Sequence, residues 1–241
     1  MAELEFHCGI MPARSGMNFY STHFVATSSQ IQQKLARDLV GAGQDSRLTA
    51  IVFANSDKPW VAKEIIPLIN YWNYRSKTYV TFFFVGYIGD ENADEYTDII
   101  ADNEITAKFD AKSFVNLIEL FEKRTDWKHE GDTPIILCRG YLNKGDTDKA
   151  HLDFQEVIEF KIEEILRNGA ILSVESFFET LIQTAEAIPG GQCHWKLSDV
   201  LGAKTLGRGI IDEVFKRIPG LAKLRAAAAF RVKNAALAQS Q

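Results

Sequence analysis

The sequence is short of the features that usually reveal where a protein works. It has three cysteines in 241 residues, too few and too scattered for a disulfide framework. No apolar run approaches the ~18 residues that a membrane span needs. No basic start followed by an apolar segment and a cleavage site marks a signal peptide. We therefore expect a cytoplasmic protein without a membrane span.

Signatures of catalysis, nucleotide binding and metal binding are also missing. No Gly-x-Gly-x-x-Gly follows an expected strand, and no Gly-x-x-x-x-Gly-Lys-Ser/Thr occurs. The adjacent pairs His7-Cys8 and Cys193-His194 lack the spacing that structural zinc sites use. Cys138 lies in an apolar run, where burial would make its thiol unreactive. We expect no metal and no cofactor, and the sequence leaves open whether the chain is an enzyme.

The net charge of −5 is unevenly distributed along the chain. From Leu201 to the end, eight basic residues stand against two acidic ones, a net charge of +6, so the first 200 residues carry −11. A basic, alanine-rich end can bind a partner protein, nucleic acid or an acidic membrane surface, or dock on the acidic body of its own or a neighbouring chain. The residues expected to contact a partner are Lys216, Arg217, Lys223, Arg225, Phe230, Arg231 and Lys233.

The apolar pattern indicates an α/β domain. With 46% hydrophobic and 24% charged residues, the chain can bury a sizeable core. Strand-like runs alternate with segments of helical period, which favours a parallel or mixed central sheet of about five strands flanked by helices. Tyr79–Val85 is almost continuously apolar, as a strand covered on both faces would be. The expected strands are residues 4–10, 18–26, 48–54, 79–85 and 134–138.

Capping residues and prolines predict where the helices begin. Ser28-Ser29 predict the start of one helix, and Pro59 suits the first turn of another. Pro67 lies inside the second helical pattern and predicts a kink or an early stop. Asp110 predicts the cap of a third helix.

Two further regions complete the expected fold. Residues 86–108 are rich in Asp, Glu and Asn, so we expect a polar loop with a short helix near residues 95–102. From Asp153 onward the apolar residues keep a helical period, which predicts only helices and places four glutamates on a solvated helix face: Glu156, Glu159, Glu163 and Glu164. The expected organisation is an α/β domain with an N-terminal strand pair at 1–150, helices packed on the same domain at 151–197, and a basic helical C-terminal extension at 198–241.

The segment Leu48–Asn70 joins a strand to a helix, which is where α/β proteins usually place a site. If the sheet is parallel, the loops after its strands share one edge of the molecule and can gather acceptors, cations and aromatic rings around a polar ligand. The alternative is that Ser56 and Asp57 only cap the following helix. The candidate ligand-binding residues are Asn55, Asp57, Lys58, Trp60, Tyr87, Asp90 and Arg139, with Ser56, Tyr141 and Asn143 beside them.

This segment resembles two known families. Asp57-Lys58-Pro59-Trp60 falls where a thioredoxin-like protein carries its Cys-x-Pro-Cys quartet, and Pro67 and Thr133-Pro134-Ile135 resemble that family's helix proline and cis-proline. The resemblance implies a thioredoxin-like core in which Asp57 and Trp60 replace both redox cysteines, so thiol exchange would be lost. Residues 52–57 also resemble the first strand and loop of a Toll/interleukin-receptor domain, whose catalytic glutamate cannot be placed here.

Two functions from different classes follow from these patterns. The preferred interpretation is a non-catalytic intracellular binding or assembly protein, whose basic C-terminal helices engage a partner protein or another copy of the chain. The alternative is a small-molecule- or nucleotide-binding enzyme or sensor with its site at the strand ends around Asn55–Trp60. Nucleic-acid binding by the basic end is a third possibility.

Overall fold

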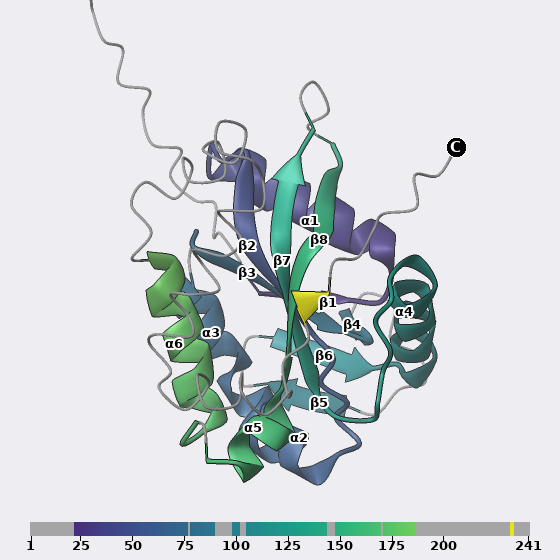
Figure 1. Cartoon of the computed structure of the whole chain (residues 1–241), viewed down its shortest axis with the longest axis vertical. Helices are drawn as coiled ribbons and strands as arrows, with labels where there is room; N and C mark the ends of the chain where they lie inside the picture. Colours follow the sequence, from purple (N-terminus) through teal and green to yellow (C-terminus); the bar gives the residue numbers. More distant parts are fainter. Residues whose placement is uncertain are drawn as a thin grey trace, which may run out of the picture.

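The computed structural model describes residues 22–76, 78–89, 98–101, 105–143, 148–169, 171–186 and 232–233 (Figure 1). At its centre is a six-stranded sheet in the order β1-β3-β2-β7-β8-β9. β3 is parallel to both β1 and β2, whereas β7, β8 and β9 each run antiparallel to the strand that precedes them in this order. The bounds are β1 Thr22–Val25, β2 Ser46–Val52, β3 Val80–Val85, β7 Pro134–Leu142, β8 Ala150–Lys161 and β9 Val232–Lys233.

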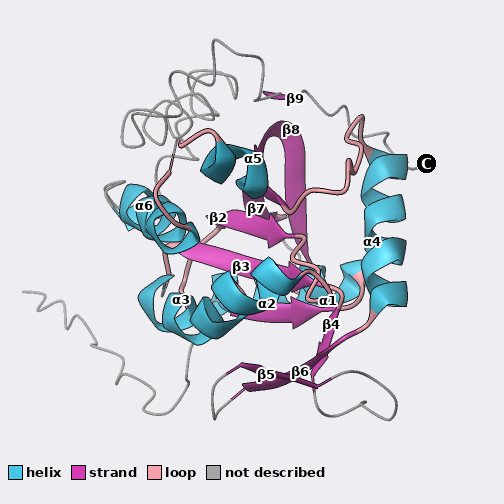
Figure 2. Ribbon diagram, turned by 90° about the horizontal axis from the view of Figure 1, so that it is seen from below, coloured by secondary structure: helices cyan, strands magenta, loops and turns pink. Residues whose placement is uncertain are grey.

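Helices cover both faces of this sheet. α3 and α6 lie side by side against one face, and α1 and α4 pack against the other (Figures 1 and 2). The α/β class and the mixed sheet are therefore confirmed. The bounds are α1 Ser28–Gly41, α2 Pro59–Glu64, the 3-10 helix η1 Ile66–Leu68, α3 Ile69–Ser76, α4 Ala111–Arg124, α5 Ile162–Arg167 and α6 Val174–Glu186.

The helix starts follow local hydrogen bonding. Asp110 caps α4 as predicted, with its carboxylate accepting from the Lys112 backbone N–H at 3.0 Å. The cap of α1 is Thr27, one residue before the predicted Ser28-Ser29, because Thr27 and Gln30 form a reciprocal capping box. Pro67 interrupts its helix as predicted, dividing it into α2, η1 and α3.

The prediction of a polar loop and a short helix within residues 86–108 is wrong. Three strands, β4 (Tyr87–Gly89), β5 (Asp98–Ala101) and β6 (Ile105–Phe109), form a second, antiparallel sheet in the order β4-β6-β5. Ala107 and Phe109 are buried and Lys108 between them is partly exposed, which is the period-2 alternation of a strand. The surrounding acidic residues obscured that short pattern.

The prediction that only helices follow Asp153 is also wrong. Residues 150–161 form β8, which pairs along its length with β7, and helix begins only at Ile162. The apolar residues here fit the period of a helix as well as that of a strand, and pairing with the neighbouring strand favours β structure. The predicted strand at 4–10 and nearly all of the region 198–241 lie outside the described residues. The exception is Val232–Lys233, which forms strand β9 within the stretch expected to be the final helix.

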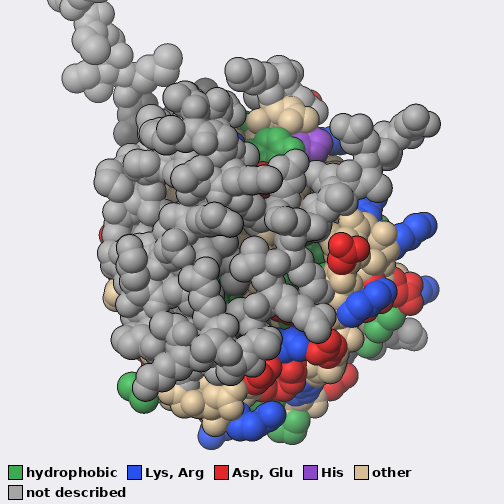
Figure 3. Space-filling view, viewed as in Figure 1, with side chains coloured by type: hydrophobic (Ala, Val, Ile, Leu, Met, Phe, Trp, Pro, Cys, Tyr) green, Lys and Arg blue, Asp and Glu red, His purple; other side chains and the backbone are tan. Residues whose placement is uncertain are grey.

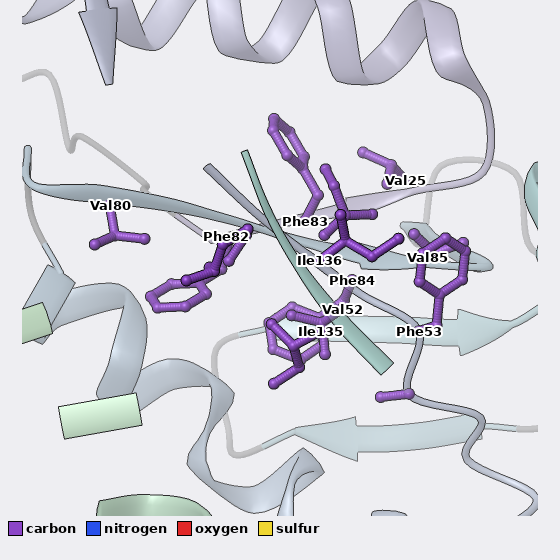
Figure 4. Packing of buried hydrophobic residues seen from close by; sticks show 14 of the residues in the cluster. Val25, Val52, Phe53, Val80, Phe82, Phe83, Phe84, Val85, Ile135 and Ile136 are labelled. Atoms are coloured by element: carbon purple, nitrogen blue, oxygen red, sulfur yellow. The ribbon is translucent and has the colours of Figure 1, made fainter. Parts of the chain in front are cut away.

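Successive side chains of β3 supply both halves of the core. Phe82 and Phe84 point to one face of the sheet and Phe83 to the other (Figure 4). Phe82 lies 5.2 Å from the ring of Phe178 on α6, and Phe83 stacks at 5.4 Å on His23 beneath α1. All three phenylalanines are fully buried, as expected for a strand covered on both sides. Among the described helices, none combines the length and apolar composition that crossing a bilayer requires.

Candidate functional site

The direction of β7 decides which loops meet at the end of β2. Because β7 runs antiparallel to β2, Val52 pairs with Ile135, and the Phe53 N–H donates to the Pro134 carbonyl at 3.0 Å. The loop after β2 therefore lies beside the loop before β7. The residues after Cys138 lie at the opposite end, where Arg139 pairs with Leu48. Tyr141 pairs there with Ser46, and Asn143 follows.

The expectation of one convergent ligand set is thus wrong in part. It assumed that β7 is parallel, which would have brought Arg139 to the edge that carries Lys58. In the mixed sheet, Asn55, Asp57, Lys58, Trp60 and Tyr87 belong to one end of the sheet. Arg139, Tyr141 and Asn143 belong to the other end, and Asp90 lies outside the described residues.

At the first end, Glu163 is the acceptor on which three segments converge. Its Oε1 accepts from the Lys58 Nζ at 2.9 Å and from the Trp60 Nε1 at 2.6 Å. It also accepts from the Thr133 hydroxyl at 3.1 Å. Lys58 additionally donates to the Gly131 carbonyl at 2.5 Å. These bonds tie the start of α2, the loop before β7 and the first turn of α5 together, and we name Lys58, Trp60, Asp132, Thr133 and Glu163 the strand-end cluster.

The neighbouring carboxyl groups of Asp132 and Glu163 have pKa values shifted in opposite directions. Burial, followed by the hydrogen bond and the repulsion from Glu163, raises the pKa of Asp132. Burial also opposes ionisation of Glu163, but the hydrogen bonds from Lys58, Asp132 and Trp60 outweigh it and hold the Glu163 pKa below its ordinary value. Glu163 therefore ionises more readily than Asp132.

His129 lies beside this cluster with an imidazole that resists protonation. Its pKa is lowered by partial burial and then by the positive charge of Lys58. The ring stands edge-on to Phe114 at 6.2 Å and tilted toward Trp127 at 5.9 Å. Its Nδ1 is buried and has no hydrogen-bond partner within the described part of the chain. A buried imidazole nitrogen without a hydrogen-bond partner thus lies close to the Lys58 ammonium group.

The loop after β2 is shaped by its own hydrogen bonds. The Asp57 N–H donates to the Asn55 side-chain carbonyl at 2.8 Å, and the Tyr87 hydroxyl donates to the Ala54 carbonyl at 2.6 Å. Burial raises the pKa of Tyr87, so its hydroxyl stays protonated. The residue that caps α2 is Lys58, and it makes no side-chain capping bond. The alternative in which Ser56 and Asp57 cap this helix is therefore wrong.

In the part of the chain that the structure describes, no cysteine lies at this edge. The quartet positions hold Asp57 and Trp60, and burial raises the pKa of Cys138 within β7. The peptide bond before Pro134 is not cis, unlike the one that the thioredoxin resemblance implies. In the described ranges, no three His, Cys, Asp or Glu side chains are grouped to hold a metal ion. The exposed surface near α2 and α5 mixes acidic and basic side chains (Figure 3).

The sequence did not predict that Asp132, His129 and Glu163 lie at this edge. Asp132 directly precedes a predicted strand, and only the direction of that strand would have shown that it meets Lys58. Glu163 was placed on a solvated helix face with Glu159. In the structure Glu159 belongs to β8 and accepts from the buried Trp127 Nε1 at 2.8 Å, and Glu163 opens α5. Of the predicted partner-binding residues, only Lys233 is described, and it pairs with Val157.

Comparisons with known proteins identify no relative. No protein-family model matches this sequence, and searches of curated proteins and of solved structures found no significant match. The fold and the geometry of its sites are therefore the basis for a functional proposal.

Proposed function

We propose that this chain is a non-catalytic binding or assembly protein built on a thioredoxin-like core without redox cysteines. The core is supported by the β-α-β-α-β run from β1 to β3, followed later in the chain by the antiparallel pair β7–β8 and the helices α5 and α6. The helix interrupted at Pro67 after β2 supports the same core. The positions that would carry thiols in that family hold Asp57 and Trp60.

The strand-end cluster supports a non-catalytic role. Glu163 Oε1 is engaged by three donors, and Lys58 is shared between Glu163 and the Gly131 carbonyl. These side chains stabilise the fold by cross-linking three segments, and the Glu163 Oε1 and the Lys58 ammonium already have partners within the chain. The edge that carries the reactive residues of a thioredoxin-like protein is thus cross-linked here by hydrogen bonds within the chain.

The observation that carries the assembly proposal is the pairing of β9 with β8. Val232 and Lys233 lie opposite Ile158 and Val157, on the open side of the strand that ends the α/β core. This segment belongs to the basic end of the chain. A terminal strand that pairs with an edge in its own chain can pair with the same edge of a second copy, because identical copies present identical backbone partners. We propose that the basic end joins two copies in this way.

Light scattering after size-exclusion chromatography tests this proposal. The full chain should elute as a species heavier than its 27.1 kDa monomer. Val232→Pro removes a backbone donor from β9 and should shift the protein toward the monomer. Val232→Thr keeps the donor and the β-branched shape, and it should behave like the original chain. A monomer in all three proteins across the concentration range would contradict assembly.

A second candidate is a sensor of small polar ligands at the strand ends. It is favoured by the unpartnered Nδ1 of His129 beside Lys58, and by the raised pKa of Asp132. A thermal-shift screen with nucleotides and small anions tests it. Lys58→Met should abolish any stabilisation by a ligand. Arg139→Met, at the other end of the sheet, should preserve it. Stabilisation that survives Lys58→Met would exclude this site.

A further inference from the structure

A groove lies between α1, α4 and the β7–β8 hairpin, at the end of the sheet away from the strand-end cluster. It encloses a cavity of about 140 Å³. Its floor includes Ile31 of α1, Phe121 of α4 and Phe154 of β8. Its polar boundary includes Arg124 and His151.

The floor of the groove offers an aromatic surface. The rings of Phe121 and Phe154 meet edge to face, with centroids 5.3 Å apart and an interplanar angle of 88°. Ile31 is only 2% exposed, so it forms a fixed apolar wall. Apolar cavities of roughly 150 Å³ admit benzene, so the groove has room for one six-membered ring or a branched aliphatic group of similar size.

The boundary of the groove is positively charged. Arg124 is exposed, and in the described part of the chain no carboxylate pairs with it. Tyr141 and His151 also line the groove, and their ring centroids lie 5.7 Å apart. α1 also begins at the groove and has no acidic residue in its first turn, so its positive end adds to the same potential.

We propose that this groove binds a small carboxylic acid that carries one aromatic ring. The ring occupies the apolar floor beside Phe121 and Phe154, and the carboxylate pairs with Arg124. Complementary charge and an apolar cavity of one-ring size select this chemistry over neutral or cationic ligands. This site is separate from the strand-end cluster and does not depend on assembly through β9.

Isothermal calorimetry on the full chain tests this proposal with 3-phenylpropionate as the probe. The acid should bind saturably, and 3-phenylpropionamide and propionate should each bind about tenfold more weakly, because each lacks one of the two interactions. Arg124→Met should weaken the binding of 3-phenylpropionate by about the same factor. Arg37→Met removes an exposed charge from α1 outside the groove and is the matched control.

Two further measurements locate the site. Leu152→Trp places a larger side chain in the groove and should abolish binding while Arg37→Met retains it. In ¹H–¹⁵N spectra, 3-phenylpropionate should shift the amides of residues 28–32 and 120–125. No saturable binding at millimolar acid, equal binding of the amide, or unchanged affinity in both Arg124→Met and Leu152→Trp would overturn the proposal. Shifts confined to residues 55–60 would overturn it as well.

Discussion

The indole Nε1 of Trp60 lies 2.6 Å from the Glu163 Oε1, across 103 residues of sequence. This bond joins the first turn of α2 to the first turn of α5. Lys58 and Thr133 donate to the same oxygen, so a single carboxylate connects both halves of the fold at this edge. Residues at the positions where a thioredoxin-like protein carries its reactive quartet therefore stabilise the structure here.

Replacing the shared acceptor should weaken the fold. Glu163→Gln keeps the shape but removes the charge that strengthens three hydrogen bonds. We expect a loss of about 1–2 kcal/mol in the free energy of unfolding, since bonds to a partly exposed charged group contribute in that range. Urea denaturation measures the change. Glu164→Gln, its neighbour on α5, should cost less than half as much, and equal losses would contradict the central position of Glu163.

Asp132→Asn should stabilise the protein at neutral pH. The pKa of Asp132 is raised in the fold, so the folded state holds its proton more tightly than the unfolded chain does. That preference favours the fold below the ordinary value of 3.8 and is lost as the pH rises through the raised pKa. An asparagine resembles the protonated form at every pH. The free energy of unfolding should be higher for Asp132→Asn than for the original protein, and denaturation at pH 7 and at pH 3 should show a larger increase at pH 7.

A gain for Asp132→Asn that is independent of pH would show that Asp132 acts through shape alone. The contribution of Glu163 to stability has the opposite pH dependence. Its lowered pKa contributes stability above the ordinary value of 4.5, and this contribution is lost as the pH falls through the lowered pKa. Glu163→Gln should therefore flatten the acid side of the stability profile.

The imidazole of His129 should titrate below 6.5, its ordinary value. Burial disfavours its charged form first, and the Lys58 ammonium adds to this effect. Lys58→Met should raise the His129 pKa toward the ordinary value without fully restoring it, because burial remains. An NMR titration of the His129 ring protons measures both values. A His129 pKa that Lys58→Met leaves unchanged would contradict the electrostatic link between the two residues.

Gly140→Ala should destabilise the packing of α1 on β7. A Cβ at this position would stand 2.5 Å from a Leu35 side-chain carbon and 2.6 Å from the Thr49 hydroxyl oxygen. Overpacking of this kind costs about 1–3 kcal/mol. Thermal unfolding should show a lower Tm for Gly140→Ala. Thr49→Ala in the same background removes one of the two clashing atoms, and it should recover part of the loss if the clash is its cause.

The sequence predicted those elements whose structure depends on residues close together in the chain. β3 is apolar at nearly every position, Asp110 supplies a side-chain cap, and Pro67 removes a backbone donor wherever the chain continues as helix. Each of these effects is confined to a few neighbouring residues. The sequence therefore located β3, the start of α4 and the break between α2 and α3.

Elements that depend on distant partners were predicted less well. The apolar pattern of β8 fits both periods, and only its pairing with β7 makes it a strand. The direction of β7 is set by the whole sheet, and an error there placed Arg139 beside Lys58 and left out Asp132. Glu163 was missed for the same reason, because its contacts with Trp60 and Lys58 span more than 100 residues.

Disulfide trapping between copies tests the central claim of assembly through β9 most directly. Val157 and Lys233 are paired across β8 and β9, so cysteines at these positions should cross-link. One chain carrying Val157→Cys is mixed with another carrying Lys233→Cys, after Cys8, Cys138 and Cys193 are replaced by serine in both. Assembly through β9 predicts a disulfide-linked dimer of the two variants under mild oxidation. A link that forms only when both cysteines are in the same chain would contradict it.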